Sequence, residues 1–284
     1  LAREGPQSGP RTLTDWHYPF AGLCFFQPAA TSRSRLQCFP FLRSTALLMS
    51  ETTRLSKRLI AQLGCSRREA ELYIGGGWVT VDGEVIDEPQ FQVDQQVVAL
   101  LPGAKADAPE PVTLLLHQEA GQNAESSRQG MTAETLSQAH GEGRRVLRGH
   151  FARLKCLAEL QAGASGLQVY TQDWRTERKI TSDLRKLEQE YVVEVSGEII
   201  KHGLERLNRG FEWKGQELPP VKASWQNETR LRMVLKNPAP GLIELLCRSV
   251  GLQVVGMRRI RLGGVAMGKL PAGQWRYLES KEKF

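Results

Sequence analysis

The sequence contains no closely spaced cysteine pair. Its five cysteines form no C-x-x-C motif and are scattered along the chain, at Cys24, Cys38, Cys65, Cys156 and Cys247. This spacing argues against a zinc site and against a disulfide framework, and it favours a reducing, cytoplasmic location. The five histidines do not cluster at metal-ligand spacing. No stretch approaches the roughly eighteen apolar residues of a membrane span. We therefore predict no metal, no cofactor and no membrane partner.

The composition is that of an ordinary globular protein with a basic surplus. The 284 residues are 40% hydrophobic and 24% charged, which leaves room for one or two domains with real cores. The net charge of +7 favours an anionic partner. Residues 1–50 are rich in Pro, Ser, Arg and Phe without a sustained period, so we predict a disordered extension or a mis-assigned start. An Arg-rich targeting peptide is the alternative.

The stretch from Ser66 to Ile86 has the clearest local pattern. Ser66 and Glu69 form a capping-box motif, which predicts a helix start, and the three glycines at 75–77 predict its end. Alternating residues on both sides of Asp82-Gly83 predict a β-hairpin. The apolar spacing just before this stretch predicts another helix, from about residue 54 to 63.

No acidic residue interrupts the segment 54–68, although it contains five basic residues: Arg54, Lys57, Arg58, Arg67 and Arg68. Arginine at a helix start opposes the helix dipole unless the site meets an anion such as phosphate. Four acids, Glu84, Asp87, Glu88 and Asp94, fall in the strands that follow. Such segregation of charge is typical of a nucleic-acid-binding surface. A solvated charged face on a small α+β unit is the alternative.

This part of the chain resembles the S4-type RNA-binding domain over roughly fifty residues. The matching segments are Arg54–Lys57, Cys65–Ala70 and Val79–Gly83, in order and with their spacing intact. The resemblance implies an S4-type domain at residues 52–101 whose two-helix face, with the five basic residues, binds structured RNA. An Ala/Pro-rich linker is expected at 102–111.

Strands and helices mix without a βαβ rhythm in residues 112–281, so we predict an α+β domain with a mainly antiparallel sheet. Asp173 is the expected N-cap of a helix that runs to about residue 187, and residues 118–145 are polar and weakly patterned. Two more helices are expected at 203–210 and 242–250. Strands are expected at 112–117, 154–160, 167–170, 191–195, 230–235, 254–255, 257–262 and 275–278.

This second domain resembles the ribosomal RNA pseudouridine synthases that carry an S4-type domain in front. The matching segments are Ser165–Leu167, Thr171–Asp173, Glu190–Val195, Val250-Gly251, Arg258–Gly263 and Leu270–Arg276. The resemblance implies the pseudouridine synthase fold and, for members of the family, the isomerisation of uridine to pseudouridine in structured RNA. The target base must leave the stack to be reached.

The sequence departs from this family at its catalytic positions. The family's aspartate lies five residues before the Gly-Leu pair, where this chain has Gln161, and the lysine two residues before the active-site tyrosine is Gln189. Residues 237–241 replace the late Arg-rich motif, with Glu244 where an arginine is expected. Of the family's active-site residues, only the tyrosine is kept, at Tyr191. The resemblance implies that its ring stacks on the target base, although a tyrosine in a strand is more often part of a core.

Two further site predictions depend on strand alternation. If 157–161 is extended, Glu159 points to the same side as Gln161 and could serve as a substitute acid. Arg259 and Arg261 would likewise share one face and could contact phosphate. We predict an RNA-binding protein, with ribosomal RNA as the expected partner, that is catalytically impaired or inactive. The alternatives are an active pseudouridine synthase and a ribosome-assembly or stress factor that binds a protein partner.

Overall fold

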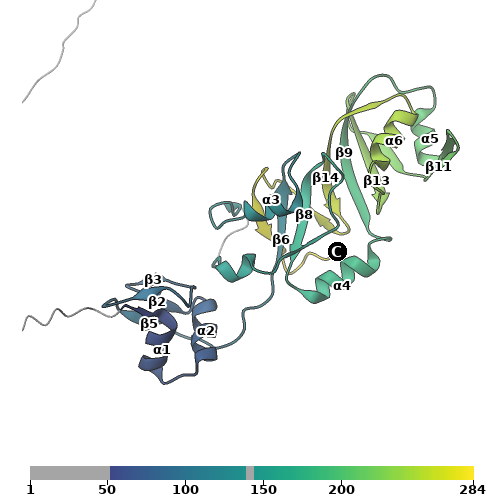
Figure 1. Ribbon diagram of the computed structural model, residues 1–284. Helices are drawn as coiled ribbons and strands as arrows, with labels where there is room; N and C mark the ends of the chain where they lie inside the picture. Colours follow the sequence, from purple (N-terminus) through teal and green to yellow (C-terminus); the bar gives the residue numbers. More distant parts are fainter. Residues whose placement is uncertain (1–51, 139–143) are drawn as a thin grey trace, which may run out of the picture. The chain divides into compact units, whose positions relative to one another are not determined.

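The computed structural model describes residues 52–138 and 144–284 (Figure 1). The prediction of a disordered extension or a mis-assigned start at residues 1–50 concerns residues outside these ranges. The first part contains two helices, α1 (Leu55–Leu63) and α2 (Arg67–Gly75), beside a small antiparallel sheet. That sheet has the order β3-β2-β5, with β2 at Val79–Val81, β3 at Glu84–Val85 and β5 at Val98–Leu100. A separate strand pair joins β1 (Thr53–Arg54) to β4 (Gln92–Val93).

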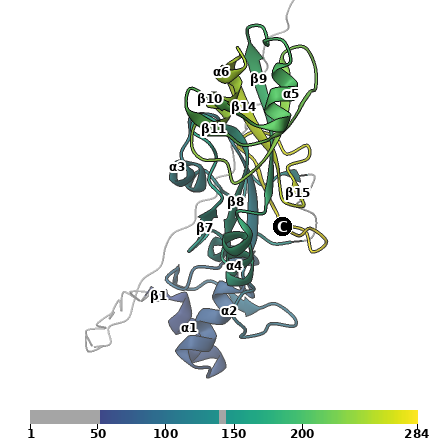
Figure 2. The same ribbon diagram turned by 90° about the vertical axis from the view of Figure 1, so that its right-hand side faces the viewer.

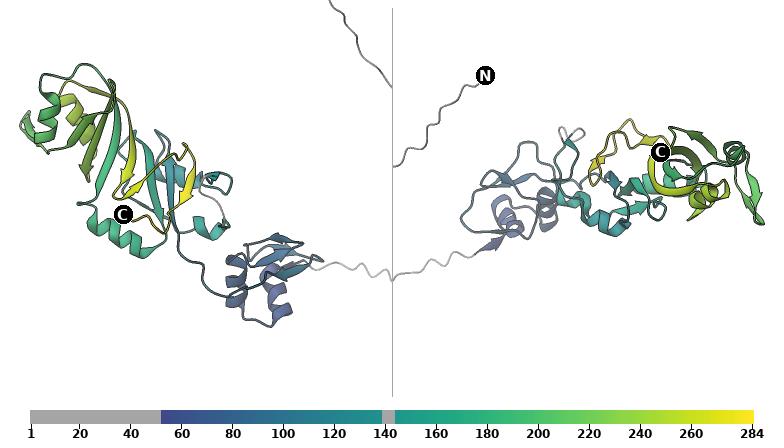
Figure 3. Two further views of the ribbon diagram at one scale, coloured as in Figure 1. Left: turned by 180° about the vertical axis from the view of Figure 1, so that it is seen from behind. Right: turned by 90° about the horizontal axis from the view of Figure 1, so that it is seen from above.

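The predicted capping box and hairpin are both confirmed. The Ser66 side chain accepts a hydrogen bond from the Glu69 N–H, and the Glu69 carboxylate accepts one from the Ser66 N–H. Asp82 and Gly83 both have positive φ angles, of 52° and 89°, as a tight two-residue hairpin requires. Helices α1 and α2 lie on one side of the small sheet (Figure 3). They share an apolar core with it through Leu55, Leu59, Ala70, Ile74, Val79 and Val81.

The second part is built on a nine-stranded sheet with the order β12-β13-β9-β14-β8-β6-β16, while β15 pairs with β14 and β7 with β8. All pairs are antiparallel except β14 with β8, which agrees with the predicted α+β class. The strands are β6 (Thr113–Gln118), β7 (Lys155–Leu157), β8 (Ser165–Thr171), β9 (Glu188–Ser196), β12 (Lys222–Trp225), β13 (Arg230–Lys236), β14 (Gln253–Leu262), β15 (Val265–Ala266) and β16 (Trp275–Tyr277).

Helices cover separate regions of this sheet. Helix α5 (Gly203–Arg209) contacts β12, and α6 (Leu242–Ser249) contacts β14 (Figure 1). Helix α4 (Trp174–Asp183) packs against β7 and β8 (Figure 2). The remaining elements are α3 (Ala124–Gln129), a 3-10 turn at Arg148–Phe151, and a hairpin of β10 (Phe211–Trp213) with β11 (Gln216–Leu218).

Two differences from the sequence predictions bear on the site. Strand β7 ends at Leu157, and Ala158 has a φ of 49°, so the chain leaves the extended conformation before residue 161. The segments at 254–255 and 257–262 form one strand, β14, whose register against β9 shifts between Arg259 and Arg261. Both features change which side chains share a face.

Candidate active site and RNA-binding surfaces

Gln161 is the residue that the sequence resemblance sets at the position of the family aspartate, and its carboxamide is buried. Its Nε2 donates to the Pro238 carbonyl at 2.9 Å, and its Oε1 accepts from the Gly241 N–H at 3.0 Å. Both ends of the amide therefore hold the segment 237–241, which leads directly into α6. A carboxylate could accept from Gly241 but could not donate to Pro238, because an ionised carboxyl group has no hydrogen. The Gln161 side chain therefore stabilises the loop 237–241 through both of its hydrogen bonds.

Tyr191 is fully buried and is part of the hydrophobic core between the sheet and α6. Its hydroxyl donates to the Gln189 Oε1 at 3.0 Å, and burial raises the pKa of this phenol. No part of its ring is exposed in this conformation, so a base could stack on it only after the surrounding side chains moved. The observed placement is the core alternative anticipated from the sequence.

Arg259 is also fully buried, and its predicted phosphate contact is wrong for this conformation. Its Nε and Nη2 donate to the Leu167 carbonyl at 2.9 and 2.7 Å, and its Nη1 donates to the Gln189 Oε1 at 3.0 Å. Burial lowers the pKa of this guanidinium. The close pairing of β8 with β14 depends on Gly166, where a Cβ atom would lie 2.3 Å from the Arg259 carbonyl oxygen. Gln189, Tyr191 and Arg259 thus form one buried polar cluster.

Glu159 does not share the environment of Gln161. Its side chain is exposed, whereas that of Gln161 is buried. The expectation of a common side fails because the extended conformation ends at the positive φ angle of Ala158. The structure therefore brings together Gln161 and the loop 237–241, and it leaves Glu159 at the surface. A substitute-acid role for Glu159 remains a prediction.

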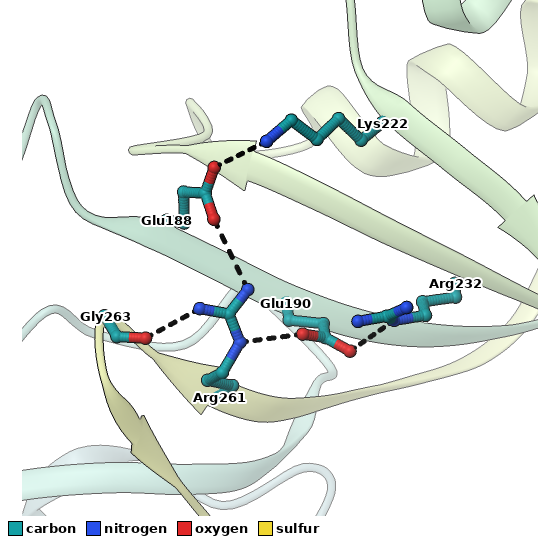
Figure 4. Close-up of polar contacts among 6 residues, drawn as sticks. All are labelled: Glu188, Glu190, Lys222, Arg232, Arg261 and Gly263. Atoms are coloured by element: carbon teal, nitrogen blue, oxygen red, sulfur yellow. Dashed lines mark hydrogen bonds and ion pairs between the residues drawn. The ribbon is translucent and has the colours of Figure 1, made fainter.

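A charged network links four neighbouring strands on another face of the sheet (Figure 4). Glu190, whose side chain is only 6% exposed, pairs with Arg232 and with the Arg261 Nε at 2.8 Å. Glu188 bonds to the Lys222 Nζ at 2.9 Å and to the Arg261 Nη2 at 3.4 Å. The hydrogen bond from Arg232, helped by Arg261, lowers the pKa of Glu190. The spacing Glu188-x-Glu190 was the sequence signal for this face, and the sequence predictions did not use it.

The prediction that Arg259 and Arg261 share a face is wrong. Arg259 bonds to Gln189, whereas Arg261 bonds to Glu190, and adjacent residues of a strand point to opposite faces. The register shift between the two arginines is a β-bulge, which inserts one residue and reverses the expected alternation. Arg261 also donates from Nη1 to the Gly263 carbonyl at 2.7 Å. Its side chain is therefore held by protein partners rather than free for phosphate.

The predicted basic surface on the two N-terminal helices is present in the structure as exposed side chains: Arg54, Lys57, Arg58, Arg67 and Arg68. Arg54 is the N-cap of α1, and Lys57 and Arg58 follow it at i+3 and i+4 in the helix, so the three are spaced to lie near one side of it. Of the five, only Arg67 forms an ion pair within the described part of the chain, with Glu71 at 2.9 Å. Apolar packing of α1 against α2 orders the helices without using these charges. Their role in RNA binding remains a prediction.

Asp173 is a helix cap, as predicted. Its carboxylate accepts from the N–H groups of Arg175 and Thr176 and from the Thr176 hydroxyl. Burial by itself would raise the pKa of Asp173, but these hydrogen bonds hold it below the ordinary value. Within residues 52–138 and 144–284, no group of three His, Cys, Asp or Glu side chains could hold a metal ion. No helix in the same ranges is long and apolar enough to cross a bilayer.

Comparison with known proteins gives the class first. A crystal structure of a pseudouridylate synthase has a TM-score of 0.50 with this chain, at 19% identity, and covers 80% of this chain and 96% of its own. The fold of the chain is therefore the pseudouridine synthase fold. No protein-family model matches the sequence.

The sequence relatives lead to the same family. An uncharacterized RNA pseudouridine synthase of Aquifex aeolicus is 27% identical over 234 residues, which are 81% of this chain and 94% of that protein. The ribosomal small subunit pseudouridine synthase A of Vibrio cholerae is 27% identical over 232 residues, 81% of this chain and 97% of its own length. The chain is thus similar to RNA pseudouridine synthases over about four fifths of its own length and nearly all of theirs.

Proposed function

We propose that this protein is an RNA-binding member of the pseudouridine synthase family that has lost most or all isomerase activity. The observation that carries the proposal is the state of Gln161. A neutral amide stands where the family has its catalytic aspartate, and both of its ends are engaged by the loop 237–241. An amide cannot act as a nucleophile or as a base at neutral pH. Loss of a nucleophile can reduce a rate by about a millionfold.

The neighbouring positions support the same conclusion. Gln189 replaces the family lysine and accepts hydrogen bonds from Tyr191 and Arg259 inside the core. Tyr191 has no exposed surface on which a base could stack. Restoring an acid at position 161 alone would therefore leave Gln189, Tyr191 and Arg259 buried and bonded to one another. These contacts support loss of the chemistry while the fold is kept.

The RNA-binding part of the proposal depends on the exposed cations of α1 and α2. Four of the five have no ion-pair partner among the described residues, so they can neutralise phosphates without first breaking a protein contact. The Vibrio cholerae relative is named as a pseudouridine synthase of the ribosomal small subunit. Structured ribosomal RNA is accordingly the partner we propose for this chain.

Two assays on the same purified protein test the proposal. Tritium release from RNA labelled at uridine C5 measures isomerisation, with an active ribosomal pseudouridine synthase as the positive control. We expect no release above background from the wild type or from Glu159→Ala. Release by the wild type that is lost in Glu159→Ala would establish the enzyme alternative and assign the substitute acid.

RNA binding is measured separately, by anisotropy of a fluorescein-labelled RNA stem-loop over a range of salt concentrations. We expect binding that weakens steeply with salt. An absence of binding to the stem-loop and to purified ribosomal RNA at low salt would refute the RNA-binding function and leave the protein-partner alternative. Pseudouridine mapping of ribosomal RNA from a deletion strain provides the cellular check, since a modified site lost on deletion would contradict the proposed loss of activity.

A further inference from the structure

Helix α4 has an exposed basic face that the family resemblance did not single out. Arg175, Arg178 and Lys179 are all exposed, and their i, i+3, i+4 spacing places them on one side of the helix. Arg185 and Lys186 follow in the turn after the helix and are exposed as well. None of these five cations forms an ion pair with a residue of the described ranges. The carboxylate of Asp173, the N-cap of the helix, attracts the neighbouring Arg175 but forms no ion pair with it. One cap carboxylate does not balance five cations, so the face keeps a surplus of positive charge.

The acids of α4 do not compensate for this charge. Glu177, in the first turn, is bound by the Lys155 Nζ at 2.7 and 2.9 Å. Asp183, the other acid of the helix, lies at its last residue and is half-buried. Arg175 also stands in the first turn, where a positive charge opposes the helix dipole. A basic residue at this position is favourable when the face meets an anion.

An exposed aromatic side chain stands at the start of the same face. Trp174 is 60% exposed, and the Arg175 guanidinium lies 5.7 Å from the centre of its ring. The packing of α4 on the sheet uses other residues, with Ile180 as the buried one. Aromatic side chains beside arginines are the surfaces on which unpaired bases stack, because every base has a π face. Tryptophan next to a row of cations fits an RNA loop better than it fits an acidic protein surface.

We propose that α4 is a second RNA-contacting element, with Arg175, Arg178 and Lys179 on the phosphate backbone and Trp174 against an unpaired base. This inference rests on the proposed RNA-binding function. It adds a contact on the pseudouridine-synthase fold to the contact on the N-terminal helix pair. The partner is a structured RNA with an accessible single-stranded loop.

The test compares the full chain with Arg175→Ala/Arg178→Ala/Lys179→Ala in the anisotropy assay with the fluorescein-labelled stem-loop. The matched control is Lys201→Ala/Arg209→Ala/Arg248→Ala, which removes two arginines and one lysine from exposed positions at or near α5 and α6. We expect the α4 variant to reduce the magnitude of the negative slope of log K against log salt by about 2.1–2.7, which is about 0.7–0.9 for each of three phosphate contacts. The control should keep the wild-type slope. An unchanged slope in the α4 variant would overturn the proposal.

Trp174 is tested on its own, because a stacking contact does not depend on salt. We expect Trp174→Ala to weaken binding to the stem-loop roughly 5- to 100-fold, whereas Trp174→Phe should retain most of the affinity. Trp174→Ala and Trp174→Phe should bind a fully double-stranded RNA of equal length with the same affinity, because that RNA offers no unpaired base. Equal affinity of Trp174→Ala and wild type for the stem-loop would overturn the stacking contact.

The outcomes separate this inference from the proposed function. If the wild type does not bind RNA, both fail. If Arg67→Ala/Arg68→Ala weakens binding while the α4 variant binds as wild type does, the proposed function stands and the α4 contact is refuted. Circular dichroism melts confirm that each variant is folded. Should the triple variant unfold, the three single alanine variants replace it, each with an expected slope change of about 0.7–0.9.

Discussion

Restoring the family's acid by Gln161→Asp should damage the fold without restoring the chemistry. The substitution keeps an acceptor for the Gly241 N–H but removes the donor to the Pro238 carbonyl, now 2.9 Å from Nε2. Leaving a buried acceptor without a partner costs about 1–3 kcal/mol, and placing a carboxylate in the same buried space adds to this. We expect a total destabilisation of about 2–4 kcal/mol at neutral pH. For a domain of this size that corresponds to a fall in Tm of about 5–15 °C.

The pH dependence of this effect identifies its cause. Burial raises the pKa of the new carboxyl group above its unfolded value of about 3.9. The unfolded state then releases its proton first, so the charge penalty is absent below the unfolded pKa and grows as pH rises toward the folded pKa. The gap in Tm between wild type and Gln161→Asp should therefore be smaller at about pH 4 than at pH 7. Gln161→Asn, which shortens the side chain but carries no charge, is the control and should show a gap that does not depend on pH.

Thermal melts by circular dichroism and the tritium-release assay complete this experiment. We expect Gln161→Asp to give no tritium release above the wild-type background, because Gln189 still replaces the family lysine and Tyr191 is still buried, out of reach of a base. A variant that is as stable as wild type at pH 7 and releases tritium would refute this reasoning. It would show that one lost acid was the whole difference from an active enzyme.

Three further predictions follow from the charges and caps. Glu190→Gln should destabilise the protein by about 1–3 kcal/mol at pH 7 in urea unfolding. Because the pKa of Glu190 is lowered in the folded state, the stability that its charge contributes is lost as the pH falls from the unfolded pKa of about 4.3 through the folded pKa. The stabilities of wild type and variant should therefore converge in acid. Asp173→Ala should cost about 0.5–2 kcal/mol by thermal melting, and Asp173→Ser should recover most of it; an equal loss in both would contradict the cap. Arg67→Ala/Arg68→Ala should lower the salt slope of RNA binding by about 1.5, with the paired Lys222→Ala as a control that leaves it unchanged.

Local sequence patterns accounted for the elements whose interactions are local. The Ser66–Glu69 capping box and the Asp82-Gly83 turn are closed by contacts between residues at most three apart, so the residues themselves specify them. The same holds for the cap at Asp173. The α+β class followed from the order of the predicted elements, and the pseudouridine synthase fold was what the resemblance of the motifs to that family implied. The short strands β10, β11 and β12 were missed, since three or four residues with mixed polarity carry little periodic signal.

The candidate site was decided by contacts between distant parts of the chain. The sequence shows a glutamine at position 161, but only the structure shows its amide bonded to Pro238, 77 residues later. The bulge in β14 placed Arg259 in the core and Arg261 in a charged network, although simple alternation puts them on one face. Identity and order of residues thus indicated the fold and placed the helix-borne charges. Burial and long-range hydrogen bonding decided which polar groups remain free to act, because both depend on partners that come together only in the folded chain.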